Sequence, residues 1–261
     1  MAFGQVFSYN KVTLREVGGN DNMTQNIRIA IDGPAAAGKS TVAKMIAEKL
    51  SIVYIDTGAM YRALTLKAIE HHLDLENEKA LVELLLKTTI TLTQKDNEKE
   101  QIILLDGKDV SEAIRSQTVS NSVSHVAKHS LVREEMVRRQ RMLADNKSVV
   151  MDGRDVGTYV LPHAEVKIFL IASVDERARR RYDENKRRGI ASDLEQLKAE
   201  IKERDDRDTN RETSPLVQAE DAIAIDTTEL SIDQVVLEIL NKVNHYLSKK
   251  TKENKNNLLD K

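Results

Sequence analysis

Residues 33–40 read Gly-Pro-Ala-Ala-Ala-Gly-Lys-Ser, which is the spacing of a phosphate-binding P-loop. The segment follows an apolar run at residues 27–31, which predicts a strand, and it opens a helical pattern at residues 39–50. A strand, a glycine-rich turn and a helix in this order form the first unit of an α/β fold. This stretch therefore predicts both the fold class and the place of an anion-binding site.

Four residues of the P-loop have a specific physical purpose. Gly33 and Gly38 allow the backbone to approach an anion closely, and the helix N-terminus directs its amides at that anion. Lys39 supplies a mobile positive charge. The hydroxyl of Ser40 is the natural magnesium ligand of such a loop. A purely structural glycine-rich turn would explain neither the lysine nor the hydroxyl.

The rest of the chain alternates short apolar runs with amphipathic helical patterns. The runs that have the length and composition of strands lie at residues 53–55, 148–151, 166–171 and 222–225. This alternation predicts a three-layer α/β fold with a central parallel sheet.

One region departs from this alternation. A helical pattern at residues 79–87 precedes two strand-like runs, at residues 89–93 and 101–105, which are separated by a polar turn and followed by a second turn. Short runs joined in this way predict antiparallel pairing. We expect an antiparallel insert within residues 64–128, packed beside the main sheet.

Composition limits the class of protein. The chain has 261 residues, of which 40% are hydrophobic, with a net charge of -2 and no cysteine. Cysteine is absent, so neither a disulfide framework nor a cysteine metal site is possible, and a reducing cytoplasm suits the chain. No apolar run reaches the roughly 18 residues of a membrane span, and the near-neutral charge argues against a general nucleic-acid binder. We expect a cytoplasmic monomer that binds neither membranes nor nucleic acids.

The two ends of the chain differ from the segment between them. Residues 1–26 end in a polar stretch just before the first strand, so we expect a flexible N-terminal extension. Residues 249–261 are rich in charge and lack periodicity, which predicts a frayed polar tail. The folded domain is then expected to span residues 27–248.

Polar side chains cluster where the second and third strands end. Residues 56–62 read Asp-Thr-Gly-Ala-Met-Tyr-Arg, and residues 152–158 read Asp-Gly-Arg-Asp-Val-Gly-Thr. Open α/β sheets bind ligands at the carboxyl ends of their strands, which is also where the P-loop lies. Thr57 and Tyr61 offer hydroxyls there, and Arg62 offers a planar fork suited to phosphate. A solvated turn would explain neither the paired charges of the second cluster nor its position.

Arginine is concentrated in residues 177–188 and again in residues 204–211. In the second segment, Arg204, Asp208 and Arg211 are spaced so that they share one face of a helix. Phosphoryl transfer spreads negative charge over several oxygens and needs positive groups around it, but no protein nucleophile. Arginines at several ends of one sheet meet that need.

Taken together, these motifs resemble the bacterial cytidylate kinases, a family of nucleoside monophosphate kinases. The resemblance covers residues 27–240 and is carried by residues 31–40, 56–62, 152–155 and 201–208. It implies an adenylate-kinase-like fold in which the insert binds the monophosphate and a short lid lies at residues 176–190. It also implies the activity, which is transfer of the γ-phosphoryl group of ATP to CMP or dCMP.

The resemblance implies roles for individual residues. Those expected to bind ATP are Gly33, Pro34, Ala35, Ala36, Ala37, Gly38, Lys39, Ser40 and Thr41. Those expected to bind CMP are Ser124, Arg133 and Asp155 at cytosine, Arg204 and Asp208 at the sugar, Arg62, Arg154 and Arg211 at the phosphate, with Thr57 and Tyr61 as further contacts. The chemistry supports this assignment, because a carboxylate accepts from the exocyclic amine of cytosine while a guanidinium donates to its ring acceptors.

The mechanism expected from the resemblance is in-line attack of a CMP phosphate oxygen on the γ-phosphorus. The groups expected to stabilise the transition state are Lys39 and Arg154, with Arg177 and Arg181 from the lid. No general base is required, because a phosphate with a second pKa near 6 is already ionised at neutral pH. The expected cofactor is Mg²⁺, held by Ser40, while Asp32 and Asp56 either orient it through water or serve only the fold.

Three other interpretations are weighed against this one. A related kinase could act on UMP, AMP or a metabolite alcohol, and the Arg133 and Asp155 pair is the feature that separates it. A P-loop GTPase would need a guanine-reading Asn/Thr-Lys-x-Asp segment, which the sequence lacks. A protein that only binds partners would leave the P-loop and the arginines without a use.

Overall fold

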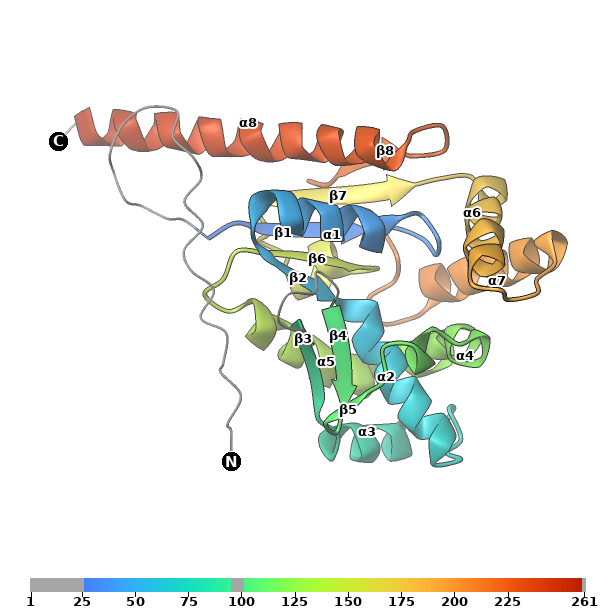
Figure 1. Cartoon of the computed structure of the whole chain (residues 1–261). Helices are drawn as coiled ribbons and strands as arrows, with labels where there is room; N and C mark the ends of the chain where they lie inside the picture. The colour runs from blue at the N-terminus through green and yellow to red at the C-terminus, as the bar shows by residue number, and fades with distance from the viewer. Residues whose placement is uncertain (1–25, 95–100, 260–261) are drawn as a thin grey trace.

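The computed structural model describes residues 26–94 and 101–259. Residues 1–25, which make up nearly all of the predicted N-terminal extension, lie outside this description. Figure 1 shows a central sheet with helices along it and a second group of elements below it.

The central sheet is parallel throughout and has five strands in the order β2-β6-β1-β7-β8. The strands are β1 (Arg28–Asp32), β2 (Val53–Asp56), β6 (Val149–Gly153), β7 (Val166–Ile171) and β8 (Ile223–Asp226). On one face, α1 (Lys39–Leu50) and α8 (Ile232–Leu259) bury their apolar stripes in one core cluster with β1, β7 and β8. On the other face, α5 (Ser130–Ala144) and the short helical turn η2 (Val156–Val160) pack against β2 and β6. The predicted three-layer α/β fold is therefore confirmed.

The predicted antiparallel strands form a separate sheet of order β3-β4-β5. Its strands are β3 (Ile90–Gln94), β4 (Gln101–Leu105) and β5 (Lys108–Asp109), and Ile90 pairs with Leu105. Around it lie α2 (Thr57–Glu70), α3 (Glu78–Leu86), the 3₁₀ helix η1 (Ala113–Arg115) and α4 (Gln117–Ala127). These elements contribute to two apolar clusters. Leu92 and Leu143 pack both against the first of these clusters and against the cluster of β2 and β6, so the core of the insert continues into the core of the central sheet.

Two helices, α6 (Val174–Arg187) and α7 (Leu194–Asn210), follow β7 and pack against each other through Ala178, Leu197 and Ile201. Figure 1 shows them side by side at the end of the sheet where the strands point. The segment expected to be the lid, residues 176–190, corresponds to most of α6 and the first residues after it.

The C-terminal prediction needs a correction. Helix α8 continues to Leu259, through most of the segment that was expected to be a frayed polar tail. Two side chains near its end bond back over one turn, since Thr251 Oγ1 donates to the carbonyl of Leu247 and Lys250 Nζ donates to Tyr246 Oη. Lysine and glutamate are good helix formers, so a helix already nucleated by a packed stripe can propagate through a charged sequence. No helix among the described residues combines the length and apolar character of a membrane span.

Gly33 is required by the contact between the P-loop and β7. Its φ is 147°, and a Cβ at this position would lie 2.2 Å from the carbonyl oxygen of Leu170. We expect Gly33→Ala to lower the free energy of unfolding by about 1 to 3 kcal/mol or more, through overpacking against backbone. Gly107→Ala is the matched control, because Gly107 has a φ of 84° but no heavy atom within 4 Å of such a Cβ. Thermal unfolding of both variants measures the difference, and equal losses would mean that the Leu170 contact is unimportant.

Candidate active site

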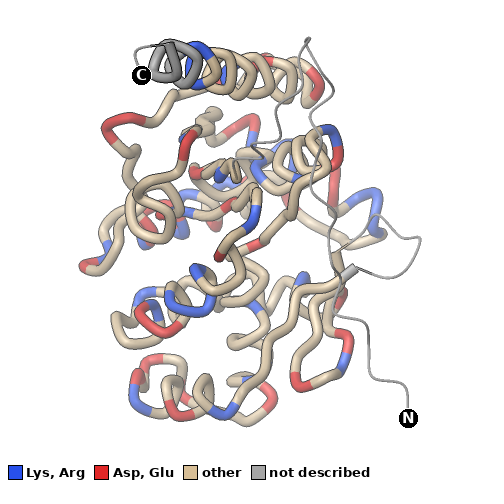
Figure 2. The backbone as a smooth tube through the Cα atoms, turned by 90° about the vertical axis from the view of Figure 1, so that its left-hand side faces the viewer, with Lys and Arg blue, Asp and Glu red and all other residues tan. Residues whose placement is uncertain are grey.

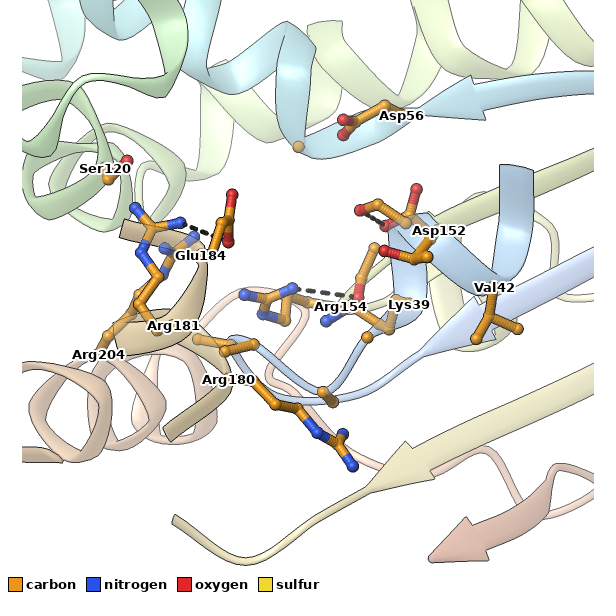
Figure 3. Close-up of a pocket in the computed structure, with 18 of the residues that line it drawn as sticks. Lys39, Val42, Asp56, Ser120, Asp152, Arg154, Arg180, Arg181, Glu184 and Arg204 are labelled. Atoms are coloured by element: carbon orange, nitrogen blue, oxygen red, sulfur yellow. Dashed lines mark hydrogen bonds and ion pairs between the residues drawn. The ribbon is translucent and has the colours of Figure 1, made fainter. Parts of the chain in front are cut away.

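A cleft of about 1250 Å³ opens at the carboxyl edge of the central sheet, between the P-loop, the insert and the two helices α6 and α7. Figure 3 shows Lys39, Asp152, Arg154, Arg181 and Arg204 around it. The predicted site residues that line the cleft are Ala35, Ala36, Ala37, Gly38, Lys39, Ser40, Thr41, Asp56, Thr57, Tyr61, Arg62, Ser124, Arg133, Arg154, Asp155, Arg181, Arg204, Asp208 and Arg211. Those that do not line it are Asp32, Gly33, Pro34 and Arg177.

The P-loop presents a buried cation to this cleft. Lys39 is 5% exposed, and its ammonium donates to the carbonyl of Pro34 at 2.6 Å. Burial lowers the pKa of Lys39 well below its ordinary value, and the charge of Arg154 lowers it further. An anionic ligand beside both cations would offset these costs.

A hydroxyl and a carboxylate meet next to Lys39. Ser40 Oγ donates to Asp152 Oδ2 at 2.7 Å, and Tyr54 Oη donates to Asp152 Oδ1 at 2.8 Å. Burial, together with the charge of Asp56, raises the pKa of Asp152 to about 6. Oxygen donors of this kind suit Mg²⁺, which usually takes one or two protein ligands and completes its shell with water and nucleotide phosphates. In residues 26–94 and 101–259 no cluster of three or more acidic, histidine or cysteine side chains is arranged to hold a metal ion.

Asp152 was not among the residues predicted to orient a metal. The prediction named Asp32 and Asp56, the acids at the ends of the first two strands. The signal for Asp152 was present, because it follows the apolar residues of β6 at the carboxyl end of that strand, and β6 lies between β1 and β2 in the sheet. Strand order is a tertiary property, so the sequence did not rank Asp152 above the other strand-end acids.

The structure gives Asp32 a structural purpose instead. Its two carboxylate oxygens accept from the backbone N–H groups of Val156 and Gly157, at 2.8 and 2.7 Å, and it does not line the cleft. Burial raises its pKa to about 7 despite these bonds. Asp56 lines the cleft, but it caps α2 through the N–H of Ala59 and pairs with Arg62 at 2.9 Å.

On the insert side of the cleft, one arginine and one aspartate form a buried pair. Arg133 is 1% exposed and Asp155 is 6% exposed, and the guanidinium of Arg133 donates to Asp155 Oδ2. The guanidinium also lies 5.5 Å from the centre of the Tyr61 ring. Burial works against the charge of Arg133, but Tyr61 and Asp155 outweigh it, and its pKa is raised.

Several buried polar atoms of the cleft have no hydrogen-bond partner among the residues that the structure describes. They are Tyr61 Oη, Arg62 Nε, Ser124 Oγ, Arg133 Nε, Arg204 Nε and Arg211 Nη2. Most buried polar groups in folded proteins are paired, so a concentration of unpaired ones needs an explanation. All six side chains line the cleft, and each of the six atoms can donate a hydrogen bond to an anionic or polar ligand.

The helix α7 adds a second group of charges. Arg154 Nε donates to Asp208 Oδ2 at 2.9 Å. The charges of both groups act on the guanidinium of Arg204. Burial and the charge of Arg154 lower the pKa of Arg204 to about 10. Burial opposes the charge of Asp208, but Arg154, Arg204 and Arg211 outweigh it and lower its pKa. A cluster of guanidinium groups of this kind is typical of a phosphate-binding site.

The structure places Arg177 outside the lining of the cleft, and its expected role in the transition state stays a prediction. Arg177 is 4% exposed and bonds to the carbonyls of Ala172 and Ala35 and to Asp205, away from the cleft. Arg181, one turn later, does line the cleft and pairs with Glu184 at 3.4 Å. The two arginines are four residues apart, so helical periodicity puts both on one face of α6. Periodicity does not show that Arg177 bonds to the P-loop backbone while Arg181 lines the cleft.

Sequence analysis also missed Arg180. Its guanidinium donates to Thr227 Oγ1 at 3.0 Å and to the carbonyl of Thr227, after β8, and both residues line the cleft. The apolar side chains of Val42 and Val235 also line this cleft. The only signal in the sequence was its membership of the arginine-rich segment.

Comparison with known proteins adds to this geometry. A family model described as cytidylate kinase matches residues 29–245. The cytidylate kinase of Geobacillus sp. (strain WCH70) is 63% identical over 222 residues, which cover 85% of this chain and 98% of that protein. The cytidylate kinase of Oceanobacillus iheyensis is 56% identical over 230 residues, covering 88% and 99%. A solved shikimate kinase from Bacteroides thetaiotaomicron is 15% identical, with a TM-score of 0.42, and covers 84% of this chain and 98% of that one.

Proposed function

The chain belongs to the cytidylate kinase family, and from that premise we propose that it transfers the γ-phosphoryl group of ATP to CMP or dCMP, giving ADP and CDP or dCDP. The observation that carries this assignment is that the P-loop lysine and the buried Arg133 and Asp155 pair line the same cleft. The site for the phosphoryl donor and the pocket for the base would therefore share one cleft. Kinases for UMP, AMP or a metabolite alcohol, and a GTPase, are not favoured.

Cytosine is assigned to the pocket formed by Ser124, Arg133 and Asp155. Asp155 would accept from the exocyclic amine, while Arg133 and Ser124 supply the donors that now lack partners. Uracil has a carbonyl in place of the amine, so it would face the carboxylate with two acceptors opposed. An unpaired buried polar group costs about 1 to 3 kcal/mol, which is about tenfold to a hundredfold in selectivity.

The phosphates are assigned to the arginines and to the P-loop. Arg62, Arg154 and Arg211 would hold the acceptor phosphate, and Arg204 and Asp208 the sugar, because all five converge on the cleft from α2, the end of β6 and α7. The P-loop amides and Lys39 would hold the donor phosphates. Arg181 would approach from the lid, and Arg180 beside Thr227 is placed to contact the rest of ATP.

Magnesium fits the oxygen donors of Ser40 and Asp152, and when bound with ATP it neutralises phosphate charge and polarises the γ-phosphoryl group. In the reaction, an oxygen of the CMP phosphate forms a bond to the γ-phosphorus as the bond from that phosphorus to the ADP oxygen breaks. The acceptor oxygen is already ionised at neutral pH, so no side chain needs to remove a proton. Lys39 and Arg154 would stabilise the charge on the transferred group, and a lid that closes over ATP would exclude water.

A coupled assay of ADP release tests this function directly. The protein is given ATP and magnesium with each nucleoside monophosphate in turn. CMP and dCMP are expected to be the best acceptors, with UMP weaker by about tenfold to a hundredfold in kcat/KM. Equal turnover of AMP or GMP would contradict the assignment of the base pocket.

Replacing Asp155 tests the base pocket itself. Asp155→Asn is expected to lower kcat/KM for CMP by about tenfold to a hundredfold, because the amide cannot both accept from cytosine and pair with Arg133 as a carboxylate does. The KM for ATP is expected to stay within about threefold, because the carboxylate of Asp155 pairs with Arg133 and Arg211, which lie outside the P-loop. Thermal unfolding serves as the control for folding, since Arg133 loses its buried counter-charge. Undiminished CMP turnover would show that Asp155 does not recognise the base.

A further inference from the structure

The tip of the P-loop packs against the helices α6 and α7. Ala36 has a φ of 59°, which is the left-handed region, and it packs against the apolar cluster formed by Ala178, Leu197 and Ile201. A residue that carries a Cβ is unfavourable in this conformation, and such strain persists only where the surroundings hold it. The shape of the loop therefore depends on contacts from outside the loop.

The residue before Ala36 is held on both of its backbone groups. The N–H of Ala35 donates to Asp205 Oδ1 at 3.0 Å, and its carbonyl accepts from Arg177 Nη1 at 3.1 Å. Arg177 and Asp205 also pair with each other through Asp205 Oδ2. Two successive peptide groups of the phosphate-binding loop, on either side of the Ala35 Cα, are thus fixed by a side chain from α6 and a side chain from α7.

Charge makes the two partners depend on each other. Arg177 is nearly fully buried, and the Asp205 side chain is only 17% exposed, so each needs the other's charge. Without Arg177, the carboxylate of Asp205 would carry an unneutralised charge beside the phosphate-binding loop. There it would repel an anionic nucleotide. Arg177 is also anchored by its Nε, which donates to the carbonyl of Ala172 at 2.9 Å just after β7.

We propose that Asp205 is a positioning residue for the phosphoryl donor, which acts through Ala35 and, with Arg177, keeps residues 35–36 in the conformation that binds phosphate. It lines no part of the cleft. The preceding residue, Arg204, does line it, so α7 contacts the acceptor side of the site and the donor loop at adjacent positions. This inference rests on the proposed function, because it assigns the P-loop to ATP.

The test compares Asp205→Asn with Asp206→Asn in the full chain. Both remove one negative charge from the same helix, but Asp206 is exposed and makes no contact with the P-loop. Titration calorimetry measures the affinity for ADP with magnesium and, separately, for CMP. Asp205→Asn is expected to weaken ADP binding by about tenfold and leave CMP binding within about twofold, whereas Asp206→Asn leaves both unchanged.

A second pair of variants keeps the proposal testable if Asp205→Asn folds poorly. Arg177→Met leaves the Asp205 carboxylate unneutralised, so it is expected to weaken ADP binding more than Asp205→Asn does. Combining Arg177→Met with Asp205→Asn removes both charges, and is expected to recover part of that loss. Thermal unfolding of each variant identifies any that is not folded.

Three results would overturn the proposal. ADP affinity could stay within twofold in Asp205→Asn or in the double variant, CMP affinity could fall as far as ADP affinity, or the two substitutions could simply add. Failure of the proposed function is a separate result, because it would appear in the unmodified protein as a lack of CMP-dependent ADP release. The ADP titrations would still show whether Asp205 holds the P-loop.

Discussion

Lys39→Met is expected to lower kcat for CMP phosphorylation by about a hundredfold to a thousandfold, because it removes one preorganised positive group from the charge that develops on the transferred phosphoryl group. The KM for ATP is expected to rise less than kcat falls, because the lysine acts mainly where charge builds up in the transition state. Steady-state kinetics with CMP and ATP measure both constants.

The same substitution is expected to leave the fold intact. Lys39 is a buried cation whose pKa is lowered by burial and by Arg154, so its charge does not favour the folded state. Methionine fills a similar volume without that charge, and we expect an unchanged or higher melting temperature. Lys49→Met is the matched control, since Lys49 is an exposed lysine at the end of the same helix. A loss of kcat smaller than tenfold would mean that Lys39 is not the phosphate-binding lysine.

Asp152→Asn is expected to lower the activity of the protein but to raise its stability. Activity is expected to fall by about a hundredfold or more, because the pair of oxygen donors that fits magnesium loses its charge. Stability without nucleotide or magnesium is expected to rise at neutral pH. Burial and the charge of Asp56 raise the pKa of the folded Asp152 to about 6, so its ionised form opposes folding.

The sign of the pH dependence follows from that raised pKa. A carboxyl that binds its proton more tightly when folded contributes most favourably below the unfolded pKa, and that contribution is lost as the pH rises through about 6. Above pH 6, the ionised group therefore costs up to about 3 kcal/mol, partly offset in the variant by weaker bonds from Ser40 and Tyr54. The gain from Asp152→Asn should be largest at pH 8 and decrease toward pH 4.

Thermal unfolding at several pH values measures this gain. We expect an increase of about 3 to 6 °C at pH 8 that falls to about half at pH 5. Asp145→Asn, which changes an exposed carboxyl at the end of α5, is the control and should show no such trend. A gain that does not depend on pH would show that the ionised carboxylate is not what opposes folding.

Local patterns predicted the main elements of this fold closely. The helix expected at residues 39–50 is α1, and the run at residues 166–171 is β7. The antiparallel runs in the insert, expected at residues 89–93 and 101–105, became β3 and β4. These elements follow from hydrophobic periodicity and turn residues, which depend on neighbours a few positions apart.

Long-range placement was harder to predict. The helix at residues 249–259 was expected to fray, because the sequence there lacks an apolar stripe, yet it continues a helix whose earlier turns pack in the core. Asp152 and Asp32 both end strands in the sequence, but only Asp152 meets Ser40 at the cleft. Which acid does so depends on the order of strands in the sheet.

The sequence alone determined that this chain has a P-loop at the edge of a parallel sheet and that it has arginines enough for two phosphorylated ligands, because those properties lie in short motifs and in the periods of strand and helix. Which charged side chains reach the cleft depends instead on how the elements pack in three dimensions. Arg181 lines it and Arg177, on the same helix, turns to Ala35 and Asp205. The reason is that a buried charge must find its partner in space, and the partners of Arg177 lie 142 and 28 positions away along the chain.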